Sequence, residues 1–160
     1  MENGKYRRTV EIDGFAGNVA VTHLPRRESL GVTIHFPNVR SLPAIVTRVR
    51  RLFDLSADIE TIDAHLSRDP LLAPLVARRP GLRAPGGWDG FELAVRAILG
   101  QQVSIPAARR LAGQLVALHG KPVSTGYGSH PNLSHVFPTA DVLPPRNLWA
   151  SACRVRVKGH

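Results

Sequence analysis

The segment between residues 88 and 118 constrains the fold most, because it predicts two amphipathic helices joined by a short polar elbow. Asp89 suits the N-cap of the first helix, and Glu92 follows at the spacing of a capping box. Gly100 ends that helix, because glycine takes the left-handed conformation at little cost, and Ser104 caps the next helix. Apolar residues at helical spacing predict the buried faces: Phe91, Val95, Ile98 and Leu99 on the first helix, and Ala107, Leu111, Leu115 and Leu118 on the second.

Two adjacent glutamines, Gln101 and Gln102, occupy the elbow. A glutamine amide offers two donors and an acceptor without a fixed charge, so this pair can meet bases or a sugar–phosphate edge. Spacing alone favours a solvated turn over a nucleic-acid contact.

The charge balance favours a polyanionic partner. The chain has 160 residues, enough for one domain or for two small pieces that share a core. It carries 21 Lys and Arg against 12 acidic residues, a net charge of +9. Nearly all the basic residues are arginine, which suits bidentate phosphate contacts. The same composition is common in proteins of GC-rich genomes, so charge alone leaves nucleic-acid binding open.

The cysteine, histidine and hydropathy patterns argue against several kinds of site and segment. The single cysteine, Cys153, allows no internal disulfide and no cysteine-cluster metal site. The seven histidines include no His-x-x-x-His pair, so we expect no metal site. The polar start predicts no signal peptide, and no apolar run approaches the roughly 20 residues of a membrane span. We therefore expect a cytoplasmic protein.

The first 53 residues predict three antiparallel strands in a meander, followed by a helix. Residues 6–36 alternate with period two, and turns fall at Asp13-Gly14 and around residues 25–28. Ser41 is expected to cap the helix. The inward positions are Val10, Ile12, Val19, Val21, Leu30, Val32, Ile34 and Phe36 on the strands, and Leu42, Ile45, Val49, Leu52 and Phe53 on the helix.

Further helices are predicted around the elbow pair. Residues 54–66 indicate a short helix that is capped near Asp58 and carries Ile59, Ile62 and Leu66 on one face. Asp69 opens another helix, which ends before residue 80. Residues 121–132 are predicted to form a surface loop, because they are rich in Gly, Ser, Pro and His. Residues 138–143 are expected to begin one more helix.

The segment from Phe91 to Ser104 resembles the corresponding motif of the AlkA-type DNA-3-methyladenine glycosylases, which belong to the helix–hairpin–helix glycosylase superfamily. Three further motifs fall in that family's order and at its spacing: Arg-Leu-Phe-Asp-Leu at 51–55, Arg-Pro-Gly-Leu-Arg at 79–83 and Phe-Pro-Thr at 137–139. The resemblance covers residues 5 to about 143, a length that is hard to reach by chance.

This resemblance implies an α+β fold in three parts. Residues 1–53 correspond to an incomplete TBP-like N-terminal domain, an antiparallel three-stranded sheet with a helix, without the family's opening strand and helix. Residues 54–143 correspond to the first helices of the all-α helix–hairpin–helix glycosylase domain. Residues 144–160 depart from the family. A shifted reading frame would restore the family's Leu-Gly-Met-Pro-like turn there, so we interpret this tail as the product of a frameshift near residues 143–147.

The family hydrolyses the bond between deoxyribose and an alkylated base, after flipping the nucleotide into a pocket where a buried Asp supports the reaction. No cofactor is needed, because a positively charged alkylpurine is already a good leaving group. The family's hairpin and catalytic Asp come later than His160, so the resemblance assigns no catalytic residue here and predicts an inactive chain. Asp54, Asp89, Glu92 and Asp141 are better explained as turn or helix-end residues.

The resemblance also assigns a role to the elbow. It implies that Gln102 is the wedge that enters the minor groove of DNA and fills the gap left by the flipped base, where some members have leucine. An amide can hydrogen-bond the orphaned base, but it excludes water less well. Gln101 is expected to border the mouth of the base pocket. Possible DNA backbone contacts, for which a solvated helix face fits equally well, are Arg96, Ser104, Arg109 and Arg110.

Three hypotheses follow for function. The chain is a truncated and inactive glycosylase whose family acts on double-stranded DNA carrying alkylated bases, in a bacterial-type cytoplasm. Alternatively, it is a non-catalytic basic DNA-binding module, or a part of an enzyme that recruits a second polypeptide. The missing hairpin also predicts exposed apolar faces at Val95, Leu99, Leu111 and Leu115, and hence a monomer that is prone to aggregate.

Overall fold

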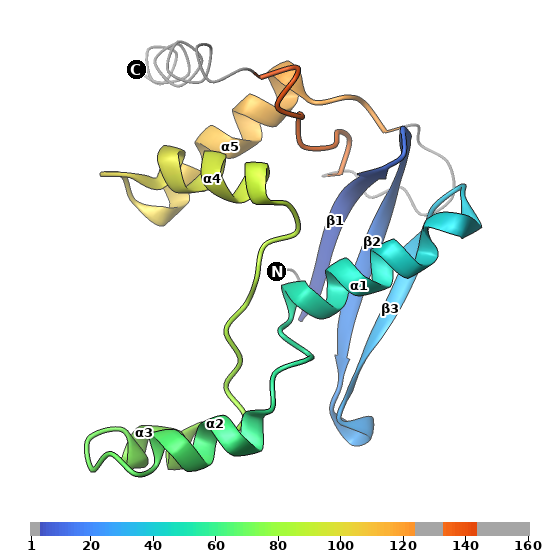
Figure 1. Ribbon diagram of the computed structural model, residues 1–160. Coiled ribbons are helices and arrows are strands. Elements are labelled where there is room, and N and C mark those ends of the chain that lie inside the picture. Colours follow the sequence, from blue (N-terminus) through green and yellow to red (C-terminus); the bar gives the residue numbers. More distant parts are fainter. Residues whose placement is uncertain (1–3, 124–132, 144–160) are drawn as a thin grey trace. The chain divides into compact units, whose positions relative to one another are not determined.

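The computed structural model describes residues 4–123 and 133–143. Over these ranges, the chain forms three strands and then five α-helices (Figure 1): β1 (Lys5–Ile12), β2 (Phe15–Leu24), β3 (Ser29–His35), α1 (Leu42–Leu52), α2 (Ile59–Leu66), α3 (Ala73–Arg78), α4 (Gly90–Gly100) and α5 (Ile105–His119). The chain divides into two compact units, one made of residues 1–41 with those from 91 onward, and the other of residues 42–90. None of the helices in the described ranges has the length and apolar character needed to cross a membrane.

The three strands form the predicted antiparallel meander in the order β1-β2-β3. Asp13 and Gly14 connect β1 to β2, and both have positive φ, 52° and 79°. Two such residues define the turn that best matches the twist of a hairpin. A 3-10 turn, η1 (Pro25–Arg27), leads into β3. The local sequence therefore sets the register of the sheet, with Val10 opposite Gly17 and Val21 opposite Val32.

The buried face of the sheet is centred on β1 and β2. Val10, Ile12, Val19 and Val21 are buried, as their alternation predicts. Val32 pairs regularly with Val21, but its side chain is exposed. The predicted inward position of Val32 is therefore wrong. Both β1 and β3 are outer strands, so the place of β3 in the sheet does not by itself explain this exposure.

Helices α4 and α5 pack through a small apolar cluster in the first unit. Its buried members are Val95, Leu99, Ala112, Leu115 and Leu143, and the half-buried Phe91, Leu111 and Phe137 pack against them. The expected exposure of the apolar faces on these two helices is therefore wrong, because Leu143 and Phe137 from the later chain contribute to the same cluster. Leu118 is exposed rather than buried. At 3.6 residues per turn it lies about 60° around the helix from Leu115.

The segment after α5 pairs with itself. Val123 donates its N–H to the carbonyl of Ser134 at 2.8 Å, and Val136 donates to Lys121 at 2.9 Å. Most of the predicted loop, residues 124–132, lies outside the described residues. The helix predicted from residue 138 amounts to one turn up to residue 143, closed by a hydrogen bond from Leu143 N to Thr139 O. The proposed frameshift tail, residues 144–160, also lies outside the described residues.

In the second unit, α1 begins where predicted, and Ile45 and Val49 are buried. The predicted cap is wrong, because the buried Oγ of Ser41 has no hydrogen-bond partner among the described residues. Asp54 forms the predicted turn after α1, with φ of 52°. The chain then returns to α1 near Trp88, whose carbonyl accepts a 2.7 Å hydrogen bond from Arg51 Nη2.

Helices α2 and α3 complete the second unit. Asp58 caps α2 as predicted, with its carboxylate accepting from the N–H and the hydroxyl of Thr61. Asp69 accepts from the N–H of Leu71, and α3 begins four residues later, at Ala73. Large apolar side chains remain exposed on both helices and beside them: Ile62, Leu66, Leu71, Leu72, Leu75 and Leu82.

Gly113 in α5 and Gly120, the C-cap that follows it, should respond oppositely to alanine. Gly113 lies within the helix and a Cβ there meets nothing within 4 Å, so Gly113→Ala should raise the free energy of unfolding by about 0.5–1 kcal/mol. A Cβ at Gly120 would collide with the carbonyl oxygens of Val116 and Val136, so Gly120→Ala should lower it. Urea unfolding of the two variants checks this difference, and equal effects would contradict the packing at Gly120.

The cap of α2 should be sensitive to acid. Hydrogen bonds from the side chain and then the backbone of Thr61 lower the pKa of the Asp58 carboxyl from its ordinary 3.8. Because the folded pKa is lowered, the cap stabilises α2 above the unfolded pKa, and this contribution is lost as the pH falls through the folded pKa. Thr61→Val should raise the pKa of Asp58 in an NMR titration. Thr47→Val, which removes a hydroxyl bonded to Pro43 instead, should leave it unchanged.

Candidate nucleic-acid interface

The elbow between α4 and α5 is exposed at both glutamines. Gly100 remains inside α4, and Gln101 donates its N–H to the carbonyl of Ile98 at 3.2 Å. Gln102, and not Gly100, takes the left-handed conformation, with φ of 58°. Helix α4 thus ends at Gly100 as predicted, but the residue in the left-handed conformation is Gln102, two positions later.

Ser104 and its neighbours fix the far side of the elbow. The Ser104 hydroxyl accepts from the N–H of Ala107 at 3.4 Å, which confirms the predicted cap of α5. Val103 is half-buried, whereas Ile105 is strongly exposed. The elbow thus has one side chain directed toward the protein and presents Gln101, Gln102 and Ile105 to solvent.

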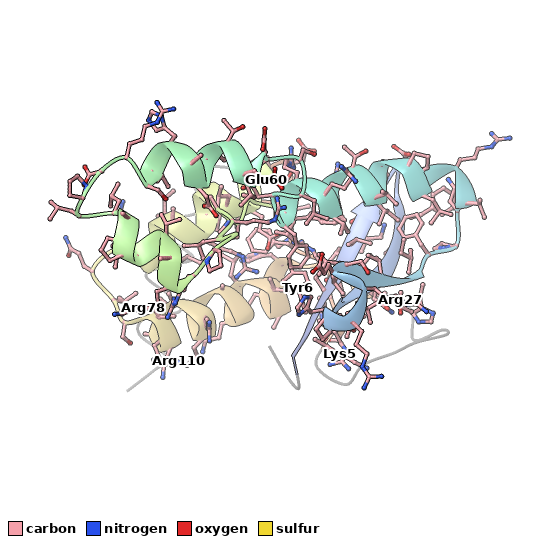
Figure 2. All side chains as sticks on the ribbon, turned by 90° about the horizontal axis from the view of Figure 1, so that it is seen from below. Lys5, Tyr6, Arg27, Glu60, Arg78 and Arg110 are labelled. Carbon is pink, nitrogen blue, oxygen red and sulfur yellow. The ribbon has the colours of Figure 1, made fainter. Side chains whose placement is uncertain are left out.

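The predicted phosphate contacts on α5 are accessible. Arg109 and Arg110 are both exposed in the second turn of the helix, and the side chain of Arg110 projects outward in Figure 2. Neither forms an ion pair with another described residue. Their guanidinium groups are free to meet an anion close to the elbow.

Arg96 is placed differently from the other predicted contacts. Its Nε donates to Glu92 Oε1 at 2.8 Å, and its guanidinium carbon lies 5.3 Å from the centre of the Phe137 ring. Its side chain is still 48% exposed. Glu92 Oε2 also accepts from Arg8 Nη2 of β1 at 2.6 Å. The spacing of Glu92 and Arg96 shows one of these pairs in the sequence, but no local pattern reveals Arg8 as the second partner.

Several carboxylates of the described residues serve structural contacts. Asp58 and Asp69 cap helices, and Asp63 accepts from the N–H of Gly81. Asp54 accepts from the N–H of Ala84, and Glu92 holds two arginines. Within residues 4–123 and 133–143, no group of three or more His, Cys, Asp or Glu side chains could hold a metal ion. Asp54, Asp58, Asp63, Asp69 and Glu92 therefore contribute to the fold itself.

Known proteins resemble this chain in sequence. Residues 1–89 match the model of the AlkA N-terminal domain. A probable bifunctional transcriptional activator/DNA repair enzyme AlkA from Mycobacterium tuberculosis is 40% identical over 143 residues, which cover 89% of this chain and 28% of that protein. DNA-3-methyladenine glycosylase 2 of Escherichia coli is 33% identical over 116 residues, 72% of this chain and 39% of that protein. The chain thus spans less than half the length of these relatives.

Solved structures show the same fold. A 3-methyladenine DNA-glycosylase from Archaeoglobus fulgidus superposes with a TM-score of 0.71 at 22% identity, over 100% of this chain and 57% of the other. An 8-oxoguanine glycosylase/lyase from Clostridium acetobutylicum, solved in complex with double-stranded DNA, has a TM-score of 0.63 at 23% identity, covering 93% and 52%. Because the AlkA N-terminal domain model matches more than half of its residues, the chain belongs to the AlkA family.

Proposed function

We propose that this chain supplies the DNA-probing part of a base-excision repair glycosylase that releases alkylated bases from double-stranded DNA. In this proposal the elbow enters the minor groove, Gln102 replaces the flipped nucleotide, and Gln101 borders the pocket that receives it. The observation that carries the proposal is the exposed glutamine pair between two packed helices, with the left-handed backbone at Gln102. The names of the relatives support it, since they describe DNA repair enzymes.

The chemistry of the elbow fits insertion into a duplex. Removing a base from the stack leaves its partner unpaired, and an inserted amide can hydrogen-bond that partner's edge. The exposed Ile105 adds apolar surface beside the amide. Arg109 and Arg110 carry positive charge in the next helical turns, where phosphate contacts would set the position of the elbow without reading sequence. Ser104 is committed to its cap through Oγ, and it is the weakest of the proposed contacts.

A second candidate function is DNA binding without chemistry. It is favoured by the structural contacts that Asp54, Asp58, Asp63, Asp69 and Glu92 make. The two candidates share the elbow as the binding element, and only base release separates them. We propose the cytoplasm as the location of the protein under both candidate functions.

The backbone at Gln102 is held in a conformation that is costly for a side chain. Left-handed φ values cost a non-glycine residue on the order of 1 kcal/mol or more. Such a cost at an exposed elbow is consistent with a side chain that serves binding rather than stability. Glycine would relieve this cost and delete the amide at the same time.

Glycine substitutions at the two elbow positions should therefore differ in their effect on the free energy of unfolding. Gln102→Gly should raise the free energy of unfolding by about 1 kcal/mol, because glycine adopts φ of 58° freely. Gln101→Gly, at a position without positive φ, should give no gain. Urea unfolding measures both, and equal effects at the two positions would contradict the left-handed backbone at Gln102.

Binding to a damaged duplex tests the proposed function. The wild type should prefer a duplex with a tetrahydrofuran abasic site over the intact duplex, and Gln102→Gly should lower that preference about two- to tenfold, as expected for one hydrogen bond. Arg110→Gln should weaken binding to both duplexes alike and reduce the salt slope by about 1. Arg27→Gln, a charge-matched change in η1, serves as the control.

Release of methylated purines by the purified chain would establish the first candidate. Binding without release would favour the second. The absence of any preference for the abasic duplex in the wild type would contradict the proposed role of the elbow in both.

A further inference from the structure

Glu92 joins two parts of the first unit that are distant in sequence. It lies in the first turn of α4, is only 8% exposed, and accepts hydrogen bonds at both carboxylate oxygens. Arg8 reaches it from β1, 84 residues earlier. The carboxylate therefore connects the sheet to the helix that leads into the elbow.

Because the Glu92 carboxylate is buried, its link to Arg8 and Arg96 requires a specific geometry. A buried carboxylate needs paired donors, and two guanidinium groups supply them in fixed planar geometry. The Arg8 side chain is 14% exposed, so this pair is little screened by water. Arg8 Nε also donates to the carbonyl of Thr9 in its own strand, which holds the guanidinium in place.

A second ion pair from β1 provides the contrast. Glu11 Oε1 accepts from Lys121 Nζ at 2.9 Å, and these side chains are 25% and 55% exposed. An exposed pair of this kind contributes little, because water and salt screen it. The same strand thus forms one shielded and one solvated link to the later chain.

The shielded link is coupled to the elbow through a single helix. Arg96 lies one turn after Glu92 and stacks on Phe137, which itself packs against the apolar cluster of α4 and α5. The elbow begins five residues after Arg96, at the end of the same helix. Because a hydrogen-bonded helix moves as a rigid rod over this length, the placement of Glu92 sets the placement of Gln102.

We propose that Glu92 is a positioning residue for DNA binding: it fixes α4 against β1 through Arg8 and Arg96, and so holds the glutamine elbow in the orientation that enters the groove. This inference rests on the proposed function of the elbow. It assigns to a negatively charged residue a favourable role in binding a polyanion, which its charge alone would not predict.

The sign of the effect makes the proposal testable. Glu92→Gln raises the net charge by one, so simple electrostatics predicts tighter DNA binding. The positioning role predicts the opposite for damaged DNA. Glu11→Gln is the matched control, because it makes the same chemical change on the solvated pair of β1.

The probe is a duplex with a tetrahydrofuran abasic site opposite 2-aminopurine, a fluorescent base that reports stacking. We expect Glu92→Gln to reduce the preference for this duplex over an intact one at least fivefold and to lower the fluorescence change at saturation. Glu11→Gln should keep both within about twofold. The saturated fluorescence change is a property of the bound complex, so loss of folded protein alone would not alter it. Circular dichroism confirms that each variant is folded.

A second pair of variants repeats the comparison with the opposite charge change. Arg8→Gln should act like Glu92→Gln, and Lys121→Gln should act like Glu11→Gln. If Glu92→Gln does not fold, the Arg8 and Lys121 variants decide the matter. Retained preference and fluorescence in Glu92→Gln or Arg8→Gln, or equal losses within either matched pair, would overturn the inference and leave the proposed function standing. A wild type that shows no preference for the abasic duplex would overturn the proposed function, and the inference with it.

Discussion

The first unit depends on a buried carboxylate that is shared between two arginines. Glu92 accepts from Arg8 of β1 and from Arg96 of its own helix, and Phe137 covers the second guanidinium. Hydrophobic contacts can slide past one another at small cost, whereas a buried charge tolerates few arrangements of its partners. The ionic cluster therefore fixes the orientation of the sheet relative to α4. The apolar cluster contributes most of the buried surface.

Local sequence patterns predicted those features of the fold that depend on neighbouring residues. The hairpin at Asp13-Gly14, the cap at Asp58 and the cap at Ser104 each follow from a few adjacent side chains, and the structure confirms them. The exposure of Val32 and Leu118 and the burial of Leu143 depend on which distant chain covers them, and periodicity does not contain that information. The Ser41 hydroxyl has no hydrogen-bond partner among the described residues, and the 3-10 turn η2 (Val39–Ser41) runs directly into α1, so the helical backbone does not start at this serine.

The candidate site was also predictable from the sequence only in part. The exposure of Gln101, Gln102, Arg109 and Arg110 follows from their place on a polar elbow and a polar helix face, and the structure agrees with it. The family resemblance supplied the wedge role of Gln102, which stays a proposal. Arg8 could not be found from the sequence, because its partner is 84 residues away and nothing in the strand marks one arginine among three basic residues.

The short antiparallel pairing after α5 has a consequence for how this protein can change. Lys121–Val123 and Ser134–Val136 hold each other by main-chain hydrogen bonds, while Thr9 donates its hydroxyl to the carbonyl of His135. Both strands of this pairing also contact β1, one through Lys121 and Glu11 and the other through His135 and Thr9. Because main-chain hydrogen bonds do not depend on the identity of the side chain, these positions can change residue type without losing the pairing.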